Sequence, residues 1–87
     1  MTSLPPPATQ QPGDDSLEKK VYGVIEQFKT NIPVMNDRYR LGYSLVKYMQ
    51  GAGDSPAVAV KSAKIHIEGI SANDLAAKLQ AELDKIK

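Results

Sequence analysis

Few residues of this chain could take part in acid–base or metal chemistry. His66 is the only histidine, and there is no cysteine. A histidine serves as a general base when a carboxylate orients it and a nucleophile lies within reach, and the sequence around His66 offers no recognisable partner of either kind. Metal sites need several ligands at set spacings, and no such set is present. We therefore predict a protein that is not an enzyme and that holds no cofactor and no metal ion.

A cluster of tyrosines and basic residues is the better candidate for function. The segment MNDRYRLGYSLVKYMQ contains Tyr39, Tyr43 and Tyr48 together with Arg38, Arg40 and Lys47. In a helix, part of this cluster points away from the apolar positions Leu41 and Leu45. Tyrosine and arginine are enriched among the residues that dominate protein–protein binding. The predicted protein-binding residues are Tyr39, Arg40, Tyr43 and Lys47. The alternative is that the tyrosines cover the edge of the core and the cations are merely solvated.

The same region suggests a second kind of partner. Between residues 38 and 64 there are five basic residues and one acidic residue, Asp54. Aromatic rings can stack on bases while cations meet phosphates, so non-specific nucleic-acid binding is the alternative function. Its candidate residues are Arg38, Arg40, Lys47, Lys61 and Lys64. The net charge of the whole chain is only +1, which favours no particular partner.

One short run resembles a known family. The residues NDRYRLGYSLV, numbers 36–46, are similar to part of the small omega subunit of bacterial RNA polymerase. Members of that family are helical assembly subunits, so the resemblance implies a helix at this place. The chain departs from the family at Leu45 and Val46, where small residues are expected, and in the register of a later Glu-Gly pair.

The clearest predicted helix covers residues 71–87. Ser71 suits an N-cap, with Asp74 three residues further on, and no proline or glycine interrupts the run. Apolar side chains recur at steps of three and four: Ala72, Leu75, Leu79, Leu83 and Ile86. The large ones form a narrow line typical of a coiled-coil seam, which predicts a possible homodimer through Leu75, Leu79, Leu83 and Ile86. The alternative is that the first helix covers this line within one chain.

Two further helices precede it. The first is predicted over residues 16–30, capped by Ser16 or Asp15, with the apolar stripe Leu17, Val21, Val24, Ile25 and Phe28. Gly23 is interpreted as the mark of a close helix crossing. The second helix is predicted to begin with Asn36 as N-cap and to stop at Gly51 and Gly53. Its inner stripe is Leu41, Leu45, Tyr48 and Met49.

The segment between residues 57 and 68 allows two interpretations. As a helix it would have Ser55 as N-cap, Pro56 at the first position and Gly69 as its stop. Its β-branched residues favour extended structure, and a hairpin would make the fold α+β. The turn of that hairpin would fall at residues 61–64, which contain no Gly, Asn, Asp or Pro. We therefore predict a helix here.

Together these elements predict an all-α bundle of about four short helices in a single domain, residues 16–87. The proline-rich residues 1–15 are predicted to be a disordered tail. No apolar run approaches the roughly 20 residues that span a bilayer, and the N-terminus lacks the pattern of a signal peptide. The expectation is a soluble, cytoplasmic, non-catalytic protein. Its predicted role is that of an interaction module or a small accessory subunit of a larger complex.

Overall fold

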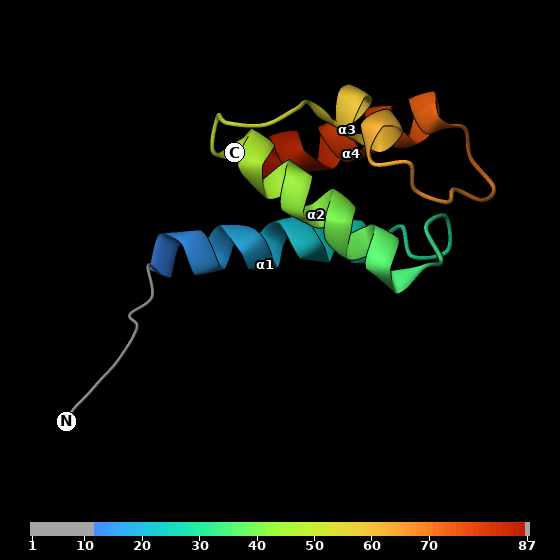
Figure 1. Cartoon of the computed structure of the whole chain (residues 1–87). Coiled ribbons are helices and arrows are strands. Elements are labelled where there is room, and N and C mark those ends of the chain that lie inside the picture. The colour runs from blue at the N-terminus through green and yellow to red at the C-terminus, as the bar shows by residue number, and fades with distance from the viewer. Residues whose placement is uncertain (1–11, 87) are drawn as a thin grey trace.

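Four helices joined by short connections make up the computed structural model, which describes residues 12–86, the first five of them by backbone alone (Figure 1). They are α1 (Pro12–Glu26), α2 (Met35–Met49), α3 (Pro56–Ser62) and α4 (Ala72–Lys85). No strand occurs between residues 12 and 86, so the all-α prediction is confirmed and the hairpin alternative at 57–68 is wrong. Residues 1–11 of the predicted tail lie outside the described part of the chain.

The core is built from one apolar face of each helix. α1 packs on α2, α3 packs on α4, and contacts of α2 with α3 and of α1 with α4 join the two pairs. In the view of Figure 1, α2 runs diagonally between α1 and the pair formed by α3 and α4. The buried apolar residues are Val21, Val24, Ile25, Ile32, Leu41, Leu45, Val46, Ala59, Val60, Leu75, Ala76, Leu79 and Leu83. Over residues 12–86, no helix combines the length and apolar character needed to cross a bilayer.

The leucine line of the C-terminal helix is buried within the single chain. Leu75, Leu79 and Leu83 are fully covered, and Ile86 packs at the margin of the core. The cover comes from α3 and α1, which both contact α4. The homodimer seam expected from these residues is thus corrected: the line is occupied inside the chain and leaves no exposed leucine face for a second copy. The predicted cap is confirmed, since the Asp74 N–H donates to Ser71 Oγ at 3.1 Å.

The first helix starts and ends earlier than predicted. It begins at Pro12 rather than at Ser16. Proline suits a first turn, because its fixed φ is helical and its missing N–H would have no partner there. At the other end α1 stops at Glu26, and tight turns carry the chain on to residue 30. The Phe28 carbonyl there accepts two N–H groups, from Asn31 and Ile32, both at 2.9 Å.

The second helix begins two residues earlier than predicted and ends where expected. Val34 is the N-cap rather than Asn36, and its side chain forms no capping hydrogen bond. At the C-terminus Gly51 has φ of 81°. Its N–H donates to the Tyr48 carbonyl and the Ala52 N–H donates to the Lys47 carbonyl, both at 2.9 Å. This pair of bonds is the Schellman arrangement, which requires the left-handed conformation that glycine adopts freely.

The third helix is about half as long as predicted. Ser55 is its N-cap and Pro56 its first residue, as expected. It ends at Ser62, however, because Lys64 turns into the left-handed region with φ of 52°. Gly69 also has a positive φ, 74°, but it lies in the connection to α4 and does not end a helix.

An extended stretch replaces the second half of the predicted helix. Ile65 and Ile67 are partly buried against the core, while His66 and Glu68 between and after them are exposed. This alternation has the period of two that extended backbone produces. β-Branched residues prefer such backbone, so Ile65 and Ile67 reach the core without continuing the helix.

A close crossing of α1 and α2 occurs at Gly42 and not at Gly23. A Cβ atom added to Gly42 would lie 2.2 Å from Cε1 of Tyr22, so the tyrosine ring rests directly on the glycine backbone. A Cβ atom on Gly23 would meet nothing within 4 Å. The interpretation of Gly23 as the crossing point was therefore wrong. This contact at Gly42 fixes the position of Tyr22 beside the exposed face of α2.

Candidate functional site

The outward side of α2 carries three large, exposed side chains in a line. Met35 is 58% exposed, Tyr39 57% and Tyr43 61%. They are four residues apart, so they follow one another along the helix surface over roughly 12 Å. Lys47 occupies the next position at the same spacing and is also exposed. We call Met35, Tyr39 and Tyr43 the α2 stripe.

Tyr22 holds Tyr39 and its helix turn in place through two contacts. The ring of Tyr22 meets that of Tyr39 edge-on, with centroids 6.1 Å apart and an interplanar angle of 71°. The Tyr22 hydroxyl donates to the Tyr39 carbonyl at 3.4 Å. Burial is the main cause that raises the pKa of Tyr22, and the nearby Glu18 carboxylate and Tyr39 add to it. Tyr22 therefore remains a neutral hydrogen-bond donor at physiological pH.

The other end of the stripe is a tyrosine–lysine pair. The Nζ atom of Lys47 lies 4.9 Å from the centroid of the Tyr43 ring. An ammonium group at this distance is attracted by the ring face, an interaction worth about 0.5–1 kcal/mol at an exposed site. The pair presents an aromatic surface and a positive charge side by side.

Arg40 is tied into the fold at the border between α2 and α3. Its Nη2 donates to Asp37 Oδ1 at 2.7 Å, and its Nη1 donates to the Ala63 carbonyl at 2.6 Å. The second bond satisfies a carbonyl at the C-terminus of α3, where helices leave such groups without internal partners. Arg40 was predicted to contact a partner directly. Its guanidinium joins two helices, but 46% of its side chain is exposed, so contact with a partner stays a prediction.

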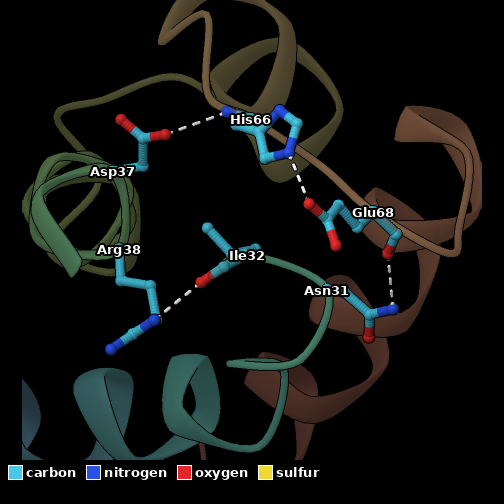
Figure 2. A network of polar contacts seen from close by, with 6 residues as sticks. All are labelled: Asn31, Ile32, Asp37, Arg38, His66 and Glu68. Atoms are coloured by element: carbon cyan, nitrogen blue, oxygen red, sulfur yellow. Dashed lines mark hydrogen bonds and ion pairs between the residues drawn. The ribbon is translucent and has the colours of Figure 1, made fainter. Parts of the chain in front are cut away.

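Asp37 is a buried carboxylate of α2 that contacts the extended stretch after α3. Its residue is 8% exposed, and Oδ2 accepts the backbone N–H of His66 at 2.9 Å (Figure 2). That hydrogen bond, followed by the one from Arg40, lowers the pKa of Asp37. The carboxylate thereby stays ionised and fastens the extended stretch after α3 to α2.

Arg38 is also engaged inside the molecule. Its Nη1 donates to the Ile32 carbonyl at 2.7 Å, as Figure 2 shows, and its Nε lies 3.5 Å from Glu26 Oε2. Only 12% of its side chain is exposed. Arg38 was a candidate for contact with phosphate, but its guanidinium is largely inaccessible. Lys61 and Lys64, from the same candidate set, are exposed near the end of α3.

The single histidine takes part in a second anchor of the extended stretch. His66 Nε2 lies 2.8 Å from Glu68 Oε2 (Figure 2). The backbone of Glu68 exchanges two bonds with Asn31, which donates from Nδ2 to the Glu68 carbonyl at 2.9 Å and accepts the Glu68 N–H at 2.8 Å. Both ends of the histidine–glutamate pair are more than half exposed. Among the residues from 12 to 86, no three His, Cys, Asp or Glu side chains gather as metal ligands would.

The structure thus divides the predicted site residues into two groups. Tyr39, Tyr43 and Lys47 share the exposed side of α2, whereas Arg38 and Arg40 form internal contacts. Sequence reasoning missed Met35, although it lies four residues before Tyr39 and continues the spacing of the tyrosines. It also missed Asp37, which looked like an ordinary acidic residue in a first helical turn.

Comparison with known proteins adds no relative: no protein-family model, no curated protein and no solved structure matches the chain. None of these comparisons supports the resemblance of residues 36–46 to the omega subunit family. What the chain does has to be inferred from its own surface.

Proposed function

We propose that this chain is a non-catalytic interaction protein, a small accessory or assembly subunit that binds another protein through the α2 stripe. The observation that carries the proposal is the exposure of Met35, Tyr39 and Tyr43, each more than half open to solvent and all on one side of one helix. Large apolar side chains that stay exposed together on a small domain are typical of interaction sites.

The stripe has the composition and the rigidity of a binding surface. Tyrosine offers a large contact area at the cost of only two side-chain torsions, and methionine adapts to irregular partner surfaces. Behind the stripe, α2 is packed on α1 and α3, and Tyr22 supports the turn that carries Tyr39. A partner would therefore meet a surface that needs little ordering, which lowers the entropic cost of association.

Site-specific photo-cross-linking tests the proposal. The photoreactive residue p-benzoylphenylalanine is placed at Tyr43 in one variant and at Ala81, an exposed position of α4, in a matched control. Both proteins are expressed in the source cell and irradiated. We expect a discrete adduct of higher mass from position 43 that is absent from position 81. Adducts that are identical at both positions, or none at position 43, would contradict the proposal.

The nucleic-acid alternative has less support. Two of its five cations, Arg38 and Arg40, donate hydrogen bonds to carbonyl and carboxylate oxygens of the chain itself. Lys47, Lys61 and Lys64 remain, and three phosphate contacts would give weak, strongly salt-dependent binding. A gel-shift series in increasing salt distinguishes the alternatives, since a mainly apolar protein contact would change little.

A further inference from the structure

A group of basic residues borders the α2 stripe. They lie on the side of α3: Lys47 stands over Tyr43, and Arg40 is bonded to Asp37 and to Ala63 at the end of α3. That end of α3 also carries the exposed Lys61 and Lys64. We call Arg40, Lys47, Lys61 and Lys64 the basic border.

Two of the three carboxylates near this border have hydrogen-bond partners, and the third, Asp54 in the loop between α2 and α3, is exposed. Asp37 is buried and bonded to Arg40 and His66, and Glu68 is paired with His66. On the opposite side of the stripe α1 carries charges of both signs: Glu18 lies close enough to Tyr22 to raise its pKa, and the exposed Lys19 and Lys20 follow it. Exposed lysines therefore outnumber exposed carboxylates on the side of α3, with Lys47, Lys61 and Lys64 against Asp54 and Glu68.

We infer that the occupant of the α2 stripe is an acidic amphipathic segment of another protein, with apolar side chains against Met35, Tyr39 and Tyr43 and carboxylates toward the basic border. This inference rests on the proposed function and adds the chemistry of the partner. A stripe roughly 12 Å long matches about two turns of a helix, whose apolar residues recur at the same three- and four-residue steps. Carboxylates along one flank of that helix would meet Lys47, Lys61 and Lys64, which sets its orientation as well as its charge.

A selection experiment tests the partner chemistry directly. A library of random linear peptides displayed on phage is selected against the immobilised full chain. We expect the enriched peptides to combine two or more large apolar residues at helical spacing with a net negative charge. A surface formed by one helix face accepts linear segments, so the absence of any peptide that depends on Tyr43 would overturn the proposed function itself.

Matched variants then test the acidic character of the partner separately from the proposed function of the α2 stripe. The double variant Lys47→Glu/Lys64→Glu should weaken the enriched peptides about tenfold, because two exposed attractions of up to about 1 kcal/mol become repulsions. Lys78→Glu on α4 alters an exposed lysine away from the border and should leave the affinity unchanged. Peptides that need Tyr43 but are neutral or basic, or that ignore the double variant, would overturn the acidic partner and leave the proposed function standing.

Two other occupants are distinguished by simple measurements on the same protein. Sedimentation of a dimer that Tyr43→Ser dissociates would show a second copy of the chain on the stripe. Binding of a fluorescent single-stranded oligonucleotide that competes with the peptides would show a nucleic acid there. Either result would overturn the inference of an acidic protein segment.

Discussion

α4 and α2 both carry large side chains at four-residue intervals, yet the two lines have opposite surroundings. Leu75, Leu79 and Leu83 are fully buried, whereas Met35, Tyr39 and Tyr43 are each more than half exposed. The spacing only determines that the members of a line share a side of their helix. Whether that side is covered depends on the rest of the chain.

The reason for the difference lies in the number of apolar lines on each helix. α4 has one, and α3 and α1 cover it. α2 has two, because Leu41 and Leu45 already face the core on the other side. A small domain can bury only one side of such a helix, so the second line remains at the surface. This second line, the α2 stripe, is the surface that we propose for a partner.

The largest expected effect is on the buried line. Leu79→Asp places a charge without a partner in the core and should abolish cooperative unfolding, since even Leu→Ala at such a site costs about 2–5 kcal/mol. Circular dichroism and sedimentation should show an unfolded monomer. Tyr43→Asp makes the matching change on the exposed line and should stay folded. A helical species of half the wild-type mass for Leu79→Asp would instead reveal a dimer seam.

The next largest effect on stability is expected at Gly42, where the ring of Tyr22 packs on α2. Gly42→Ala drives a Cβ atom into the ring of Tyr22 and should destabilise the fold by about 1–3 kcal/mol, the usual cost of overpacking. Gly23→Ala serves as control, because its Cβ atom meets nothing and alanine is favoured in a helix by about 1 kcal/mol. Urea unfolding should therefore show opposite shifts for the two variants. Equal shifts would contradict the close crossing at Gly42.

A third prediction uses the border between α2 and the extended stretch. The His66 N–H and Arg40 hold the pKa of Asp37 below its ordinary value. The stability that Asp37 contributes is complete above the unfolded carboxyl pKa of about 3.9 and is lost as the pH falls through the lower pKa of the folded state. Asp37→Asn should be less stable than wild type at neutral pH, and the difference should shrink below about pH 4.

The stability difference is checked by measuring urea midpoints of wild type and Asp37→Asn over a pH series. Asp54→Asn, at an exposed loop residue, serves as control. A constant difference between wild type and Asp37→Asn at every pH would mean that the charge of Asp37 plays no part in holding the stretch.

Most of the fold follows from local sequence, and the exceptions have tertiary causes. Helical periodicity identified the inward lines of α1, α2 and α4, and Ser71 and Gly51 were recognised as helix ends. The early end of α3 was not foreseen. It depends on Arg40 and Asp37, more than 20 residues earlier in the chain, which bind Ala63 and His66.

Only part of the candidate site could be predicted, because local sequence does not show contacts between distant elements. Tyr39, Tyr43 and Lys47 were found from their residue types and spacing, which are local properties. The internal use of Arg38 and Arg40 could not be read from spacing, because Ile32, Glu26 and Ala63 lie on other elements. An arginine on a helix surface has the same sequence pattern whether it meets a partner or its own chain.

The smallest expected effect on stability is at the exposed line, where the effect on binding should be largest. Tyr43→Ser removes a ring that is 61% exposed, so the free energy of unfolding should change by no more than about 0.5 kcal/mol. Truncation of a central aromatic anchor typically weakens a protein complex by 2 kcal/mol or more, about thirtyfold in affinity. Lys29→Ser, at an exposed position in the turns after α1, controls for a general surface change. Loss of stability without loss of binding would assign Tyr43 to the fold and leave α2 without a binding line.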